Sequence, residues 1–202
     1  MVLSDTKIRK LVVEKKLISD FVETNLQAAS YDFMSGDIIR SFRGAKGGID
    51  LRKQPDINMM SEDYLITEGY DMMPNEYVLV KVKEKISLPD NIVGHIRPRT
   101  TYTKLGLILT GQHINPTFEG YLYVGLRNAT PTSLRIYPGL VIGQFVFEKI
   151  DGKVTEKLLY KNKTNAKYQN EDGYIPPKVR EELPEELKLK YDELVNELAG
   201  GK

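Results

Sequence analysis

The 202-residue sequence contains no cysteine and only two histidines, His95 and His113. Without cysteine the chain can form no disulfide and can use no thiol as a nucleophile. The His/Cys zinc site of the nucleobase deaminases is excluded for the same reason. A zinc site of histidines and carboxylates would need a spacing such as HExxH, which the sequence lacks. We therefore expect no zinc, and no metal site formed by protein ligands alone.

The sequence also lacks a strong charge of either sign and long apolar runs. Its 29 basic and 28 acidic residues give a net charge of +1. Nucleic-acid and membrane surfaces attract proteins through net or clustered positive charge, so we expect neither as a partner, although a local basic cluster can bind a small anion. No apolar run has the length of a membrane span, and the N-terminus has no signal-peptide stretch. We therefore expect a cytoplasmic protein.

The patterning predicts one mainly β domain. Residues 3–18 predict a short helix, which Ser4 caps and whose apolar stripe contains Ile8. From about residue 30 to 160 short β-rich runs alternate with Gly, Pro, Asn and Asp. These runs are residues 76–86, 91–96, 105–110, 121–128, 133–137 and 140–150. Because no helical pattern separates them, we predict an antiparallel sandwich or barrel.

Two regions depart from this pattern. Residues 40–62 are weakly patterned and are expected to form a loop-rich excursion. After Tyr174, two prolines precede a highly charged helical pattern. We therefore predict a domain over residues 1–175 and a helical C-terminal extension over residues 176–202. The extension is either a solvated helix docked by a narrow apolar stripe or a helix that binds a partner or caps an oligomer.

The densest group of functional side chains lies in RPRTTYTKLGL, residues 97–107. Arg99 and Lys104 supply cationic donors, and Thr100 and Thr101 supply hydroxyl and backbone N–H groups. A polyphosphate is bound by such a mixture of charge-assisted hydrogen bonds and small hydroxyl residues. The same residues are equally consistent with a polar loop whose positive charge has no binding role. The segment lacks GxxxxGK[ST], and no helix is expected after it, so it is not a P-loop.

Two other polar segments flank this group in the sequence. AASYDFMSG, residues 28–36, suggests a buried tyrosine and a carboxylate, Asp32, that orients loop groups, but we favour a structural turn. In the tail, Tyr160 has the chemistry to stack on a ring and Lys167 the charge to reach a phosphate. This part of the chain is either a mobile lid or an ordinary polar linker.

Taken in order, these segments resemble the dCTP deaminase/dUTPase family. LSDTKIRKLV is similar to the family's N-terminal helix, and QAASYDFMSGD resembles the signature PASYDLRLG. RTTYTKLGL resembles R-S-S-x-x-[RK]-x-G-[LI] with Thr in place of Ser, and HINPTFEG resembles R-I-D-P-x-x-x-G. YPGLVIGQFVFE resembles RPGMxIGQLxFE, and AKYQNEDG is similar to the deaminase tail KYQ-x-Q. The resemblance runs from about residue 2 to 175.

The resemblance implies a distorted antiparallel β-barrel or jelly roll of the dUTPase type. It also implies a homotrimer with nucleotide sites between subunits. The ligand would be a pyrimidine deoxynucleoside triphosphate, with Mg²⁺ bound through its phosphates. The residues that the resemblance places at the nucleotide are Arg99, Thr100, Thr101 and Lys104, on the triphosphate, and Asn115, Tyr160, Lys167 and Glu171.

The same resemblance exposes two missing acids. In the family's deaminases, a glutamate ten residues beyond the aspartate of I-D-P activates water and protonates the leaving amine. Here Asn115 stands at the aspartate position and Gly125 at the glutamate position. Glycine transfers no proton, and an amide is a far weaker base than a carboxylate. The catalytic residue is therefore unknown, with Glu171, or Glu119 in an expected turn, as stand-ins. Alternatively, Gly125 leaves space beside Tyr123 for a ligand larger than a pyrimidine.

Three functions are consistent with these residues. The first is the family's hydrolytic deamination of dCTP to dUTP, in the biosynthesis of pyrimidine deoxynucleotides (dUMP). The second is a catalytically degenerate sensor or sequestering protein that binds nucleotides without converting them. The third, a dUTP diphosphatase, is disfavoured because Asn115 replaces the base that activates water in that reaction.

Overall fold

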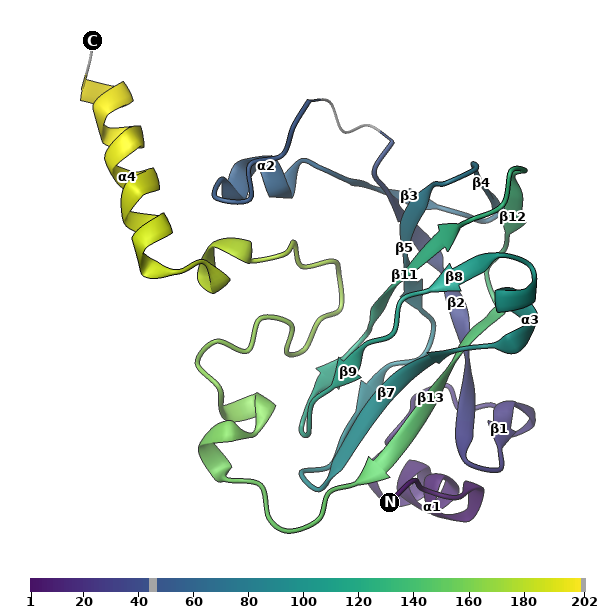
Figure 1. Ribbon diagram of the computed structural model, residues 1–202. Coiled ribbons are helices and arrows are strands. Elements are labelled where there is room, and N and C mark those ends of the chain that lie inside the picture. Colours follow the sequence, from purple (N-terminus) through teal and green to yellow (C-terminus); the bar gives the residue numbers. More distant parts are fainter. Residues whose placement is uncertain (44–46, 201–202) are drawn as a thin grey trace. The chain divides into compact units, whose positions relative to one another are not determined.

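The computed structural model describes residues 1–43 and 47–200 and confirms the mainly β fold. Antiparallel strands form one large sheet that curls into a half-barrel, with two short two-stranded ribbons beside it (Figure 1). The strands are β1 (Leu26–Gln27), β2 (Ser30–Ser41), β3 (Glu62–Leu65), β4 (Tyr70–Met72), β5 (Tyr77–Val82), β6 (Ile86–Ser87), β7 (Ile92–Pro98), β8 (Leu107–Leu109), β9 (His113–Ile114), β10 (Glu119–Gly120), β11 (Tyr123–Asn128), β12 (Leu134–Ile136) and β13 (Val141–Lys149). The helical segments are α1 (Asp5–Lys15), η1 (Glu23–Asn25), α2 (Gln54–Asn58), α3 (Thr100–Lys104), η2 (Glu156–Leu158), η3 (Tyr160–Asn162), η4 (Val179–Glu182) and α4 (Glu185–Gly200).

The large sheet has the strand order β8-β11-β5-β2-β13-β7-β9, and β1 and β3 also pair with β2. Strand β2 joins the two halves of the curl. Its first residues pair with β13, whereas residues from Ser35 onward pair with β5. The register shifts between Ser35 and Ile39 and again, in β13, between Val141 and Gly143. Such irregularities bend a strand and increase its twist, so they explain why the sheet curls.

Strand β2 corrects one sequence-based interpretation. The segment at residues 28–36 was expected to form a turn, but Ser30 begins a 12-residue strand. Alternation along this strand buries Tyr31 and Phe33 in the core. Phe33 stacks on Phe145 with ring centroids 4.5 Å apart. Gly143 permits this contact, because a Cβ there would lie 2.6 Å from an edge atom of the Phe33 ring.

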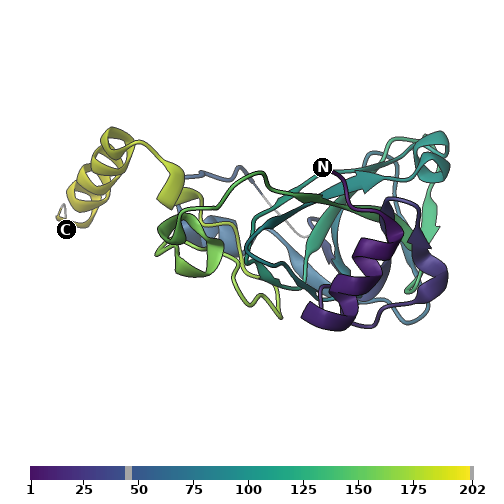
Figure 2. The same cartoon turned by 90° about the horizontal axis from the view of Figure 1, so that it is seen from below.

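Helix α1 forms within the predicted region and lies at one end of the curled sheet (Figure 2). Ile8 is completely buried against the core, as its place in the apolar stripe predicted. Ser4 is the N-cap residue, but its hydroxyl bonds to Thr6 Oγ1 at 2.9 Å rather than to the helix backbone. The chain before the helix is held by Leu3 N–H, which donates to Phe147 O at 2.9 Å.

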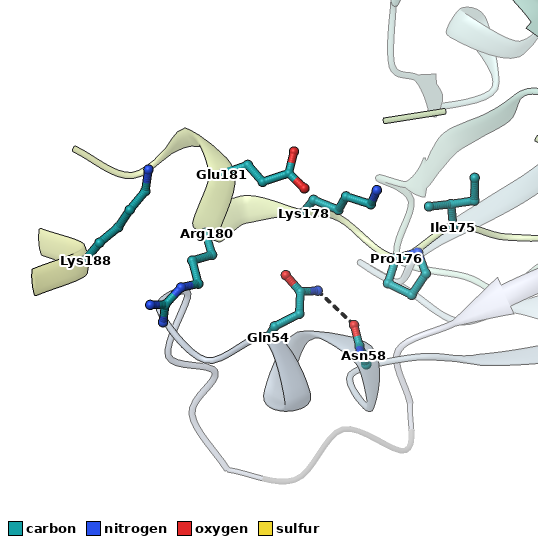
Figure 3. A pocket seen from close by; sticks show the side chains of 8 residues that line it. All are labelled: Gln54, Asn58, Ile175, Pro176, Lys178, Arg180, Glu181 and Lys188. Atoms are coloured by element: carbon teal, nitrogen blue, oxygen red, sulfur yellow. Dashed lines mark hydrogen bonds between the residues drawn. The ribbon is translucent and has the colours of Figure 1, made fainter. Parts of the chain in front are cut away.

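The chain divides into two compact units, Met1–Ser41 with Asp63–Tyr174, and Phe42–Glu62 with Ile175–Lys202. In the second unit, Gln54 of α2 donates hydrogen bonds to Asn58 Oδ1 at 2.8 Å and to Pro177 O at 2.9 Å. A cavity of about 610 Å³ in this unit is lined by side chains of α2 and of residues 175–188. Figure 3 shows these side chains. This division reflects packing, so the expected domain boundary at residue 175 stays a prediction.

A buried carboxyl group, Glu84, lies between β5 and β6. Its side chain is fully buried, and Glu84 Oε2 accepts the Met34 N–H at 3.1 Å. Glu84 Oε1 accepts the Tyr31 hydroxyl at 3.4 Å. Because burial disfavours the charged form, the pKa of Glu84 is raised above its usual 4.5. Burial likewise raises the pKa of Tyr31 to about 12.

The raised pKa of Glu84 predicts how stability depends on pH. A group whose pKa is higher in the folded state contributes stability that is complete below its unfolded pKa and is lost as the pH rises through its folded pKa. Glu84→Gln keeps an acceptor for Met34 but has no proton to lose. Urea unfolding between about pH 4 and about pH 8 should therefore show the wild type losing stability relative to this variant as the pH rises. Parallel curves would contradict the prediction. Glu14→Gln, at a side chain that is 52% exposed, is the control.

Candidate functional site

The cationic segment follows β7 at one end of the sheet. Arg99 directly precedes α3, a five-residue helix that contains Thr100, Thr101 and Lys104. This helix lies inside a segment for which no helix was expected. The two threonines and Lys104 are exposed, and Arg99 is partly buried. Gly106, with φ +81°, then leads the chain into β8. The four residues that the resemblance placed on a triphosphate therefore lie on α3 and on the residue directly before it.

Asp32 holds the Arg99 side chain in place. Its carboxylate is only 5% exposed and forms an ion pair with the Arg99 guanidinium. Gln144 donates to Asp32 Oδ1 at 2.9 Å, and Gln27 donates to Asp32 Oδ2 at 3.2 Å. Three donors thus converge on one buried carboxylate, and this network fixes the orientation of the Arg99 side chain. The sequence singled out Asp32 as a possible orienting group, but it gave no signal for Gln144.

The second group of predicted residues surrounds the turn after β9. Asn115 O accepts the Phe118 N–H at 3.1 Å, which closes the turn as an Asn-Pro sequence favours. The tail after β13 returns to this turn, where Tyr160 N–H donates to Pro116 O at 3.1 Å. The Tyr160 and Phe118 rings lie 5.8 Å apart. Asn115 and the tail are therefore neighbours, as expected for a shared site.

The cationic segment and the Asn115 turn lie apart within one chain. Ile114 pairs with Gly94 of β7, and Arg99 lies five residues further along that strand direction. At about 3.3 Å per residue, this corresponds to about 17 Å. The predicted ligand residues therefore form two groups, one at each end of β7.

Gly125 does not leave an open space. It lies in β11 on the same face as Tyr123 and pairs with Leu79 of β5. A Cβ built on Gly125 would overlap the Tyr77 hydroxyl and would lie 2.6 Å from Thr110 Oγ1. Gly125 N–H donates to the same Thr110 oxygen at 3.0 Å. The expectation of a gap for a larger ligand is therefore wrong, because Tyr77 and Thr110 fill the side-chain position.

The two proposed stand-in carboxylates differ in their surroundings. Glu119 lies in β10 rather than in a turn, and its carboxylate pairs with Lys85 Nζ at 2.6 Å. Glu171 is buried, and its backbone bridges to Gly120. Burial raises the pKa of Tyr123 to about 12, with smaller contributions from the charges of Asp63 and Glu171. Glu171 is therefore near Tyr123. Tyr123 precedes Gly125 by two residues and lies on the same face of β11.

Within residues 1–43 and 47–200, no group of three or more His, Cys, Asp or Glu side chains is arranged to hold a metal ion. No helix in this described part of the chain is both long enough and apolar enough to cross a membrane.

Comparison with known proteins gives a consistent result. A family model described as dCTP deaminase-like matches residues 2–150. The chain is 30% identical over 190 residues to a protein of Aquifex aeolicus named dCTP deaminase, dUMP-forming, covering 93% of this chain and 99% of that protein. It is 29% identical over 188 residues to a protein of Campylobacter concisus named dCTP deaminase, covering 87% and 97%.

A solved structure, the 2′-deoxycytidine 5′-triphosphate deaminase from Agrobacterium tumefaciens, superimposes with a TM-score of 0.60. The match covers 73% of this chain and about half, 48%, of that chain, at 18% identity. At this identity the likeness concerns the fold alone.

The Asp32–Arg99 pair can be tested by its effect on stability. Asp32→Asn removes the negative charge that pairs with the Arg99 guanidinium. It also places an amide N–H₂ group, which can only donate, against side chains that are themselves donors. Since the Arg99 side chain is 30% exposed, solvent screens part of the ion pair, and we expect a loss of about 1–2 kcal/mol in unfolding free energy. Urea unfolding should also show that Arg99→Gln costs less in the Asp32→Asn background. Simple additivity would rule out this coupling. The exposed Asp90→Asn is the control.

The packing at Gly125 predicts a dependence on Tyr77. Gly125→Ala should lower the unfolding free energy by about 1–3 kcal/mol, because the added methyl group overlaps Tyr77 and Thr110. In a Tyr77→Ala background the same substitution should cost clearly less. A double-mutant cycle in urea measures this difference. Equal costs in both backgrounds would show that Tyr77 does not occupy the position. Gly173→Ala, where a Cβ has nothing within 4 Å, is the matched control.

Proposed function

Because the chain belongs to the dCTP deaminase-like family, we propose that it binds a pyrimidine deoxynucleoside triphosphate and deaminates dCTP to dUTP, within pyrimidine deoxynucleotide biosynthesis. The observation that supports the deamination step most strongly is the 30% identity, over 93% of the chain, to a protein named dCTP deaminase, dUMP-forming. Release of dUTP as the product is supported by the 29% identity to a protein named dCTP deaminase. In this reaction water adds to the ring carbon that bears the amino group, and ammonia leaves. A location in the cytoplasm, where we expect the protein, suits an enzyme of free nucleotides.

The segment around Arg99 would bind the triphosphate. Asp32 fixes the Arg99 side chain, so that little side-chain entropy remains to be lost when a phosphate binds. Lys104 adds a mobile positive charge, and the Thr100 and Thr101 hydroxyls add donors without bulk. Mg²⁺ prefers oxygen ligands and is commonly carried by substrate phosphates. Since the described residues offer no carboxylate cluster for it, the metal would be coordinated through the triphosphate.

A second copy of the chain would complete the site. Arg99 and the Asn115 turn are separated by about 17 Å along β7, which favours a site to which two copies contribute residues. This separation supports the homotrimer that the family resemblance implies, with each site shared between neighbouring subunits. Asn115, Tyr160 and Lys167 would come from one subunit and Arg99 from another.

Proton transfer would have to use a residue other than the one at position 125. Glycine has no group for it, and Tyr77 and Thr110 occupy the space beside Gly125. Of the two stand-ins, Glu119 has a side chain that is 43% exposed to solvent. Glu171 is buried near Tyr123 and on the tail. We therefore assign the exchange of protons between water and the leaving amine to Glu171.

The filled position at Gly125 also favours a second candidate function. If Glu171 does not reach the cytosine ring, the chain binds nucleotides without converting them and acts as a sensor or a sequestering protein. A dUTP diphosphatase remains the weakest of the three candidates, because Asn115 is a poor base for water attacking phosphorus.

One experiment separates these functions. Purified full-length chain is incubated with dCTP, dUTP or ATP and Mg²⁺, its thermal stability is measured, and ammonia, dUTP and dUMP are quantified. We expect stabilisation by dCTP and release of ammonia, with dUTP as product. Arg99→Ala should lose the stabilisation, and Glu171→Gln should keep it while losing about 10²-fold or more in turnover. Stabilisation without ammonia would establish the second function, and no stabilisation by any pyrimidine nucleotide would exclude both.

A further inference from the structure

The side chain of Gln169 binds the backbone of the Asn115 turn on both sides of Phe118. Gln169 Nε2 donates to Thr117 O at 3.1 Å, and Gln169 Oε1 accepts the Glu119 N–H at 3.3 Å. One amide group therefore satisfies a backbone acceptor and a backbone donor of the turn, as a neighbouring strand would. No sequence-based argument gave Gln169 this role.

Further hydrogen bonds join the same two segments. The Thr117 hydroxyl accepts the Lys161 N–H at 3.0 Å. Asn170 N–H donates to Glu119 O at 2.7 Å, and Tyr121 N–H donates to Glu171 O at 2.7 Å. We call the bonds of Gln169 and Thr117 to the facing segment the tail clasp. The clasp joins the tail at Lys161 and Gln169 to the turn at Thr117 and Glu119, close in sequence to the predicted nucleotide-binding residues.

The backbone of the turn shows how firmly the clasp constrains it. Thr117 has φ +64°, a conformation that a β-branched residue rarely adopts and that costs free energy. Such a residue persists only where its surroundings over-determine it, and here the tail binds both its hydroxyl and its carbonyl. Gly120 allows the tail to approach closely, because a Cβ there would lie 2.9 Å from Glu171 N.

We propose that Gln169 and Thr117 are positioning residues that hold the tail on the Asn115 turn before any nucleotide binds. The tail is then already ordered, so the binding free energy of the nucleotide does not have to offset the entropy cost of ordering it. The inference rests on the proposed function only in taking Asn115, Tyr160 and Lys167 as nucleotide-binding residues. Gln169 and Thr117 act through those residues and not by touching the ligand.

The first arm of the test needs no nucleotide. Hydrogen exchange of the full-length chain reports the protection of the Lys161, Asn170 and Tyr121 amides, which bond across the clasp. We expect these amides to be protected in the wild type, and their protection to fall about tenfold in Gln169→Leu and in Thr117→Val, from the loss of one or two hydrogen bonds. Thr117→Ser keeps the hydroxyl and should retain protection. Asn170→Gly tolerates the positive φ of +58° and keeps the backbone bond, so it is the matched control.

The second arm measures dCTP affinity by calorimetry on the same variants. Gln169→Leu should bind about tenfold more weakly, and saturating dCTP should restore the amide protection, which damage to the barrel would not allow. Unprotected tail amides in the nucleotide-free wild type would overturn the proposal, as would unchanged affinity in Gln169→Leu. If the wild type binds no nucleotide, the proposed function fails, whereas the clasp is still judged by the exchange of its amides.

Discussion

The structure depends on the bend in β2. This one strand pairs with β13 at its beginning and with β5 at its end, and the register shift between Ser35 and Ile39 turns it from one half of the sheet to the other. The rings of Phe33, two residues before this shift, and Phe145 stack on each other in the core. Strand alternation then places Asp32 on the opposite side from Phe33, where its carboxylate reaches Arg99. One face of β2 therefore packs in the core, and the opposite face orients Arg99.

The curl also explains why the candidate site has two parts. Strand β7 runs between them, with the Asn115 turn beside its beginning and Arg99 beyond its end. The tail, which carries Tyr160, Lys167 and Glu171, docks on the Asn115 turn through the clasp. Under the proposed function, each end of β7 would supply half of a nucleotide site. Repetition of the chain around an axis would join unlike halves.

The position of Gly125 shows how neighbouring side chains can fill the space beside a glycine. A hydroxyl from β5 and a hydroxyl after β8 converge on the glycine, and Thr110 bonds to its backbone. Close packing of this kind disfavours any larger residue at this position. In the proposed reaction, proton transfer would therefore use a group from another direction, and the tail supplies a buried glutamate, Glu171, near Tyr123.

The sequence alone determined the mainly β class, the helix around Ile8, the polar character of the Arg99 segment and the absence of carboxylates at positions 115 and 125. These features follow from local alternation, turn residues and residue identity, which need no knowledge of distant partners. The sequence missed the strand at Tyr31, the short helix after Arg99 and the strand at Glu119. It also missed the contacts of Tyr77 with Gly125 and of Gln169 with Thr117. Only the tertiary structure decided these, because Asp32 and Arg99 are 67 positions apart and Gln169 and Thr117 are 52 apart. Contacts over such separations depend on the register of several paired strands, and a shift of one residue would turn every side chain to the other face.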